Sequence, residues 1–309
     1  MKAEHHVRVA RHRPVGMMSA ALAAGAAADS SPGGAKSGCQ AWPLPLDATC
    51  AGTARRLFRE SVADLGLSGD VVHDGVTMVS ELAANTLHAQ GNVEFDGSRQ
   101  RPITGQPELW SYVRNCPTGY ELVCKIFDSQ RGWKAGAPPN PAQVTLESVN
   151  GRGLKVVSEL SDGRWGHHLT RARLGRWKVQ GKAVWFAIPV AQARGASRLA
   201  HPPMTSCQAA KELEALLVDR GVGRKLVRSD ESVADIAVLS VRRDLTVWCR
   251  GGMVSWRGTD RSQQRRPYTD LVEVAEQVVR AHEELDHPDH VAAIEIPVLS
   301  NGNGSAPSA

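Results

Sequence analysis

The stretch that most constrains this chain runs from residue 71 to residue 89, with the sequence VVHDGVTMVSELAANTLHA. Its apolar residues recur at three- and four-residue steps, which predicts an amphipathic helix. Glu81 and Asn85 are four residues apart, so they share one face of that helix. A carboxylate can orient or deprotonate a nucleophile, and a carboxamide oxygen is a suitable ligand for Mg²⁺. The same spacing also occurs as a solvated pair on ordinary helices, so the motif needs support from the rest of the chain.

Composition narrows the class of protein. At 309 residues the chain is long enough for two domains, or for one domain with long appendages. A hydrophobic content of 42% with 22% charged residues is typical of a soluble globular protein. The net charge of +5 comes without a dense run of Lys and Arg interleaved with aromatics, which makes nucleic-acid binding an unlikely function. No stretch is apolar enough to span a membrane, and six scattered cysteines without a C-x-x-C motif predict reduced thiols in a cytoplasmic protein.

Shifts in composition divide the chain into five parts. The basic start followed by an Ala- and Gly-rich run does not match an export signal, so residues 1–38 are expected to be a disordered arm, with Met17 or Met18 as a possible true start. Apolar periodicity then predicts a first domain over 39–192. A linker is predicted over 193–204, because this stretch is small and polar and ends with the sequence HPPM. A second small domain follows over 205–290, and residues 291–309 are disordered by composition.

The first domain is expected to contain helices and strands in alternation. The predicted elements are an edge strand at 41–47, helices at 51–65 and 71–89, a hairpin of strands at 109–115 and 120–128, a helix ending at Leu160, and strands at 164–170 and 183–189. The second hairpin strand ends at Asp128. A long Gly- and Pro-rich stretch follows, and in a compact domain such a stretch is usually functional.

That stretch closes with Gly151, Arg152, Gly153 and Leu154 at the start of the predicted helix. Glycines at a helix N-terminus allow backbone N–H groups to approach an anion, and the helix dipole favours phosphate there. An ordinary turn at the start of a helix is the alternative interpretation.

Taken together, these motifs resemble the GHKL (Bergerat, HATPase) ATP-binding domain, and within it the actinobacterial anti-sigma-factor serine-kinase-like regulators. The likeness covers about residues 44–190 and rests on VSELAANTLHA, FDSQRGW, NGRGLKVV, and DGRWG followed by GKAVWFAIP. It implies an α/β fold of the α+β two-layer sandwich type, with helices on one face of a mixed, mostly antiparallel sheet. It also implies ATP and Mg²⁺ as ligands, and a homodimer is plausible.

The resemblance assigns a role to each motif residue. Asn85 would hold Mg²⁺, Glu81 would be the general base, and Asp128 would accept the adenine amino group. The alternative for Asp128 is a solvated carboxylate at the end of a hairpin. The remaining nucleotide-binding residues would line the adenine and the phosphates: Gly132, Gly151, Arg152, Gly153 and Leu154.

Three positions depart from the family pattern. Gln130 stands where the first glycine box has a glycine, Ala183 stands where many relatives have a threonine, and His88 lies three residues after Asn85, where many relatives have a His four residues after. Two hypotheses follow. One is a protein serine/threonine kinase that phosphorylates an anti-sigma-factor antagonist-like protein. The other is a non-catalytic, nucleotide-responsive module that binds a sigma factor or similar partner.

The second domain is predicted to be a small α-β-β-β-α module of unknown role. Its elements are a helix at 207–217, strands at 237–241, 245–249 and 253–256, and a last helix capped by Thr269. Trp248 and Trp256 are expected in its core. Its repeated arginines form either a solvated face or a surface for an anionic partner.

Overall fold

The computed structural model describes residues 38–90, 105–132, 152–176, 178–190, 204–231 and 234–286. All of these residues belong to one compact unit. The expectations for the arm before residue 38, for the tail 291–309 and for the linker up to residue 203 concern residues outside this set. The predicted domain boundaries therefore stay predictions.

The first sheet has five strands in the order β1-β2-β3-β5-β4. They are β1 (Gln40–Pro43), β2 (Glu108–Cys116), β3 (Gly119–Asp128), β4 (Trp165–Arg171) and β5 (Gln180–Val190). All four pairings between these strands are antiparallel. The prediction of a mixed sheet is therefore wrong, and its mostly antiparallel character is confirmed. The reason is that β5 lies between β3 and β4 and runs opposite to both.

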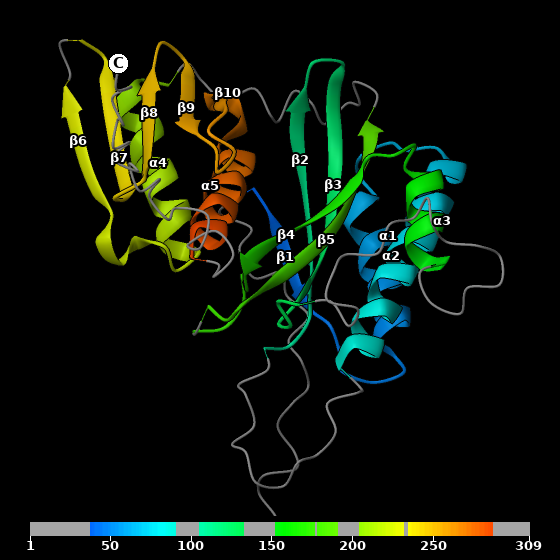
Figure 1. The fold of residues 1–309 in the computed structure, drawn as a ribbon. Helices are drawn as coiled ribbons and strands as arrows, with labels where there is room; N and C mark the ends of the chain where they lie inside the picture. Colours follow the sequence, from blue (N-terminus) through cyan, green and yellow to red (C-terminus); the bar gives the residue numbers. More distant parts are fainter. Residues whose placement is uncertain are drawn as a thin grey trace, which may run out of the picture. The chain divides into compact units, whose positions relative to one another are not determined.

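Three helices cover one face of this sheet: α1 (Cys50–Val62), α2 (Gly69–Gln90) and α3 (Arg152–Leu160) (Figure 1). Their apolar stripes bury a common core against the strands, in which Phe58 of α1 lies 6.2 Å from Phe186 of β5 between ring centroids. Gly75 allows α2 to pack closely, because a Cβ at this position would overlap the Phe58 ring. The α2 helix begins at Gly69, two residues before the predicted start, and the Ser68 hydroxyl accepts a hydrogen bond from the backbone N–H of Val71.

The second sheet also has five strands, in the order β10-β9-β8-β7-β6, and all of its pairings are antiparallel. Its elements are α4 (Ser206–Asp219), a 3₁₀ turn (Gly223–Lys225), β6 (Val227–Glu231), β7 (Ile236–Arg242), β8 (Leu245–Arg250), β9 (Met253–Arg257), β10 (Gln263–Pro267), a 3₁₀ turn (Tyr268–Asp270) and α5 (Leu271–Leu285). The α-β-β-β-α prediction is therefore wrong in its number of strands. The two missed strands, VRSDE and QQRRP, are edge strands with polar sequences, so no apolar alternation marks them.

The two helices of this second part begin in different ways. Thr205 and Gln208 form a capping box at the start of α4, in which each side chain accepts a hydrogen bond from the other residue's backbone N–H. Thr269 does not cap α5 as predicted. A 3₁₀ turn precedes this helix and places Asp270 at the N-cap, while the Thr269 hydroxyl accepts a hydrogen bond from the Asn115 side chain.

The second face of the first sheet is covered as well, because α5 packs against β2 and β4. The Tyr112 hydroxyl of β2 donates a 2.6 Å hydrogen bond to Glu273 of α5. The helices predicted for the first domain lie on one face of its sheet, and the helix on the other face, α5, comes from the C-terminal part of the chain. The coarser prediction, an α+β arrangement of helices on antiparallel sheets, is confirmed by the two sheets and five α-helices of the described residues.

Two further findings bear on the class of protein. Among the described residues, no helix has both the length and the apolar character that crossing a membrane requires. All six cysteines lie in described segments, and each is a free thiol.

Candidate functional site

Glu81 and Asn85 lie on the face of α2 that is turned toward α3. Glu81 is half-buried and Asn85 is exposed. A Cβ added to Gly153 would lie 2.6 Å from Glu81 Oε2 and 3.2 Å from Asn85 Nδ2. The structure therefore brings together three predicted site residues, and only a residue without a side chain leaves Glu81 and Asn85 in their present positions.

The start of α3 is fixed by its apolar residues. Leu154 and Val157 are buried and pack into the core shared with α2, and this packing holds Gly153 against the Glu81/Asn85 pair. Arg152 is the first residue of the helix and is exposed. Gly151 lies outside the described residues. The sequence predicted glycines at the start of this helix, and Gly153 and Leu154 lie in the first turn of α3, next to α2.

Asp128 ends β3 and is buried, with 3% of its surface exposed. The alternative of a solvated carboxylate is therefore wrong. Asp128 Oδ2 lies 2.7 Å from Lys182 Nζ, and its Oδ1 accepts a 3.0 Å hydrogen bond from the backbone N–H of Gln130. Lys182 stands opposite Asp128 in the pairing of β3 with β5, and its ammonium also donates to the Gln130 carbonyl. The acceptor expected to bind adenine thus already pairs with a lysine that sequence analysis missed.

Two glycines near Asp128 differ in how closely the chain packs around them. Gly132 is exposed, and a Cβ there would meet no protein atom within 4 Å, so its expected place beside adenine stays a prediction. At Gly181 a Cβ would overlap the Asp128 carbonyl and the Phe127 ring. Gly181 is thus the glycine on which the packing around Asp128 depends. In the sequence, the Gly-Lys pair just before the predicted strand 183–189 marks this glycine.

Ala183, one of the positions that depart from the motif pattern, is fully buried opposite Phe127 in the strand pairing. It therefore adds no polar group beside Asp128. The candidate site consists of two parts: the Glu81, Asn85 and Gly153 group between α2 and α3, and the Asp128–Lys182 pair where the central strand β3 ends beside β5.

A second set of charged groups lies on the opposite face of the sheet. Glu276 of α5 is buried and lies 2.6 Å from Arg173, 3.1 Å from Arg220 and 3.2 Å from Lys125. Burial raises the pKa of Glu276, but the three neighbouring cations outweigh burial and hold this pKa well below its usual range. Burial, and next the charge of Lys125, lower the pKa of His168 well below its usual value, so this imidazole is neutral.

A cavity of about 300 Å³ adjoins this charged cluster. Its lining includes Tyr112, Lys125, Trp185, Trp256, Glu273 and Arg280. The carboxylates of this lining have hydrogen-bond or ion-pair partners within the chain. Glu273, for example, accepts hydrogen bonds from the Tyr112 hydroxyl and the Gln277 amide. We therefore interpret the cluster as the contact that holds α5 on the sheet.

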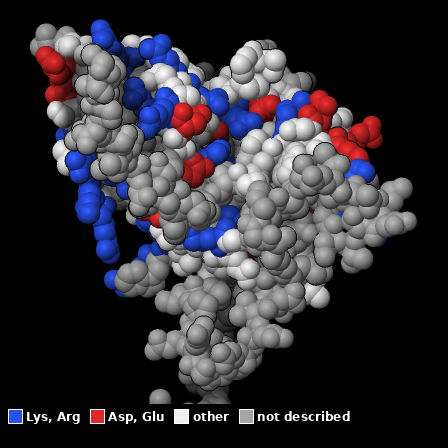
Figure 2. Space-filling model, viewed as in Figure 1, with Lys and Arg blue, Asp and Glu red and all other residues white. Residues whose placement is uncertain are grey.

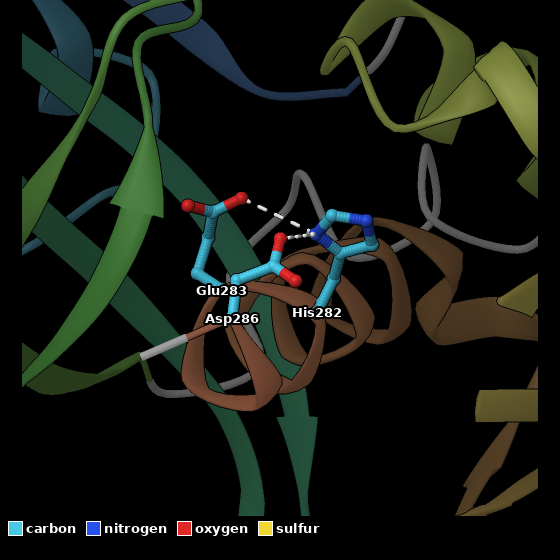
Figure 3. Close-up of side chains that lie close together, drawn as sticks. All are labelled: His282, Glu283 and Asp286. Atoms are coloured by element: carbon cyan, nitrogen blue, oxygen red, sulfur yellow. Dashed lines mark hydrogen bonds and ion pairs between the residues drawn. The ribbon is translucent and has the colours of Figure 1, made fainter. Parts of the chain in front are cut away.

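Three side chains that could bind a metal lie close together at the C-terminal end of α5 (Figure 3). They are His282, Glu283 and Asp286, and one possible ligand atom of each lies within 4.8 Å of those of the other two. Arginines already neutralise both carboxylates: Arg171 pairs with Glu283, and Arg242 pairs with Asp286. A cation would have to displace these arginines, so the arrangement is an ion-pair cluster and no metal centre is assigned to it.

No protein-family model matches this chain, and no curated protein compared with it matches either. The family resemblance therefore stays a prediction that rests on the motifs, and the function has to be argued from the site.

Proposed function

We propose that this protein is a regulatory protein that binds Mg-ATP between α2 and the glycine motif at the start of α3. One observation carries the proposal. A Cβ added at Gly153 would come within 3.2 Å of both the Glu81 and the Asn85 side chain, so the residues expected to be the general base, the magnesium ligand and part of the phosphate-binding motif lie side by side. The order of α1, α2, the β2–β3 hairpin, α3, and β4 with β5 also agrees with the predicted ATP-binding fold.

The residues present fit these ligands. The Asn85 side chain is exposed, so its amide oxygen is accessible to Mg²⁺. The first N–H groups of an α-helix have no carbonyl partner within the helix itself, so a helix start such as that of α3 favours phosphate. Mg-ATP would supply the phosphoryl group, and the Glu81 carboxylate would take the proton from the attacking hydroxyl of a protein serine or threonine.

On this proposal the protein acts like an anti-sigma-factor serine/threonine kinase. Its partner would be a sigma factor or an antagonist-like protein, and its process transcriptional, stress or developmental regulation in the cytoplasm. The intact Glu81 and Asn85 motivate the kinase assignment.

A non-catalytic, nucleotide-responsive module that binds a partner is the second candidate. The observation that favours it is the Asp128–Lys182 ion pair, because the adenine acceptor is engaged inside the chain. Nucleotide would then act as a conformational ligand and no phosphate would be transferred.

Isothermal titration calorimetry with Mg-ATP tests the proposal, using wild type, Asn85→Ala and Asp128→Asn. We expect binding in wild type and a marked loss in both variants. A loss in Asn85→Ala alone would mean that Asp128 does not select the base. No binding at millimolar ATP would overturn the proposed function.

A phosphorylation assay then separates the two candidates, with Glu81→Gln as the control. Transfer to an antagonist-like protein that Glu81→Gln abolishes supports the kinase. Binding without any transfer or hydrolysis supports the non-catalytic module.

A further inference from the structure

The second sheet has one buried face and one exposed face. Its inward side chains, such as Leu239, Val247 and Trp256, form a core with α4 and α5. Side chains alternate along a strand, and directly paired residues point to the same side. The opposite side includes the exposed residues Val227, Trp248, Arg250, Met253, Arg257 and Arg265, and we name these six residues the outer face; Glu231 of the edge strand β6 lies on the same side.

The outer face carries large apolar side chains that the fold does not bury. Trp248 is 50% exposed, Val227 is 63% exposed and Met253 is 37% exposed. Met253 pairs with Arg250, which is two residues from Trp248 on β8, so Met253 is a diagonal neighbour of the indole. The prediction that Trp248 is a core residue is therefore wrong, whereas Trp256, in the adjacent strand, is 2% exposed as expected.

Arginines surround this tryptophan. Arg250 lies two residues from Trp248 along the same strand. On β9, Ser255 pairs with Trp248, and Arg257 is two residues beyond Ser255. On β10, Arg265 pairs with the other side of Ser255. Within the described part of the chain, none of these three arginines forms an ion pair, whereas Arg228, Arg242 and Arg266 do. Figure 2 shows Lys and Arg side chains over the part of the view that holds the second sheet, with some Asp and Glu among them.

We propose that the outer face is a docking surface for an acidic segment of a partner protein. Trp248 and Met253 would pack against apolar side chains of that segment, and Arg250, Arg257 and Arg265 would pair with its carboxylates. Tryptophan, methionine and arginine are the residue types enriched in protein interfaces, while lysine is depleted there. The proposal does not depend on nucleotide binding.

Two other occupants fit the outer face less well. A second copy of the chain in a symmetric contact would place arginines opposite arginines, and like charges disfavour that pairing. Sheets that bind single-stranded nucleic acid stack two or three bases on aromatic residues, and among the described outward residues of this sheet only Trp248 is aromatic. The apolar neighbours of Trp248 on this side, Val238 directly opposite and Met253 diagonally, also favour a polypeptide.

Fluorine NMR on the full chain labelled with 5-fluorotryptophan tests the proposal, with Trp248→Phe used to assign the Trp248 resonance. The probe is a synthetic peptide of twelve residues in which glutamates alternate with leucines and serines. A peptide of the same pattern with lysines, and the oligonucleotide dT12, serve as comparisons. We expect the glutamate peptide alone to shift the Trp248 resonance, with an affinity that falls as salt is raised.

Charge variants make the test specific to this surface. The triple variant Arg250→Gln, Arg257→Gln, Arg265→Gln should weaken peptide binding by about tenfold. The control Arg224→Gln, Lys225→Gln, Arg243→Gln removes the same charge from exposed residues outside the outer face and should bind like wild type. All of the substituted side chains are exposed, so thermal unfolding is expected to stay close to wild type.

Three results would overturn the proposal. They are an unshifted Trp248 resonance at millimolar glutamate peptide, an equal loss of binding in both triple variants, and tighter binding of dT12 than of the peptide at the same resonance. The last result would assign the outer face to single-stranded nucleic acid.

Discussion

At the scale of single residues, the candidate site depends on what surrounds each side chain. Gly153 lies against Glu81 and Asn85, whereas Gly132, which the sequence marks in the same way, lies in open space. Asp128 has the position that the motif predicts, but Lys182 neutralises it. Residue type and spacing could identify these positions, but they could not show which glycine is sterically required.

Gly153→Ala tests this distinction. The added Cβ would displace the ends of Glu81 and Asn85, which are flexible side chains, so the protein should still fold. We expect weaker Mg-ATP binding by about tenfold, comparable to losing one hydrogen bond to a charged group. Calorimetry measures the affinity, and Gly69→Ala at the start of α2, where a Cβ would meet nothing within 4 Å, is the matched control that should bind like wild type. Unchanged affinity in Gly153→Ala would mean that Glu81 and Asn85 do not contact nucleotide.

At the scale of elements, caps and edges decide where the helices and strands of the second sheet begin and end. Thr205 and Thr269 precede helices in the sequence, and both are candidates for N-caps. Only Thr205 caps its helix. The edge strands β6 and β10 exist because they pair with β7 and β9, while their own sequences carry mostly polar residues.

Thr205→Ala should therefore destabilise the protein by about 1 kcal/mol, because the first turn of α4 loses a hydrogen-bond acceptor. Thr269→Ala removes only an exposed side-chain hydrogen bond and should change the free energy of unfolding by less than about 0.5 kcal/mol. Urea unfolding of both variants measures the difference. Equal losses in the two variants would contradict the assignment of the caps.

At the scale of the whole molecule, α5 connects the two sheets. It contributes apolar residues to the core of the second sheet and buried carboxylates to the second face of the first. Glu276 is the centre of this contact, because three cations from the rest of the chain converge on it. The cost of removing one partner from such a buried cluster is large, because the remaining charges are left unpaired.

Glu276→Gln should lower the free energy of unfolding by about 3–5 kcal/mol, since Lys125, Arg173 and Arg220 would keep their charges in a buried site. Glu214→Gln is the control. It breaks the more exposed pair with Arg228 and should cost less than about 1 kcal/mol. Urea unfolding compares the two variants. Near-equal stabilities would show that α5 is not held by this cluster.

The stability of the whole molecule should also depend on pH through Asp270. Burial, and next the charge of Glu273, raise the pKa of Asp270 from 3.8 to about 7. The folded state therefore binds more protons than the unfolded state between about pH 4 and pH 7. The contribution of Asp270 to stability falls as pH rises through this window and is constant above it. The fall is on the order of 4 kcal/mol, from about three pH units at 1.36 kcal/mol each.

Asp270→Asn removes this titration and keeps an oxygen that can accept the hydrogen bond from the Asn115 backbone. We expect the variant to gain stability relative to wild type as pH is raised from 4 to 7. Thermal unfolding of both proteins across this range gives the difference directly. A difference that is constant with pH would show that Asp270 does not titrate in this window.

The sequence by itself determined most of the elements and the position of the Glu81/Asn85 helix, because these depend on local periodicity and on residues close together in the chain. It also placed Asp128 at a strand end and the glycine motif at a helix start. What it could not supply was any partner distant along the chain. The pairing of Lys182 with Asp128 spans 54 residues, and the pairing of Glu276 with Lys125 spans 151.

The tertiary structure alone decided which face of each element meets another element. Glu276 and Trp248 are opposite examples. Glu276 is charged but buried, because three cations surround it. Trp248 is large and apolar but half-exposed, because it lies on the side of its strand that faces away from the core. Residue type sets only the tendency of a side chain to be buried, and packing between segments decides these two cases against that tendency.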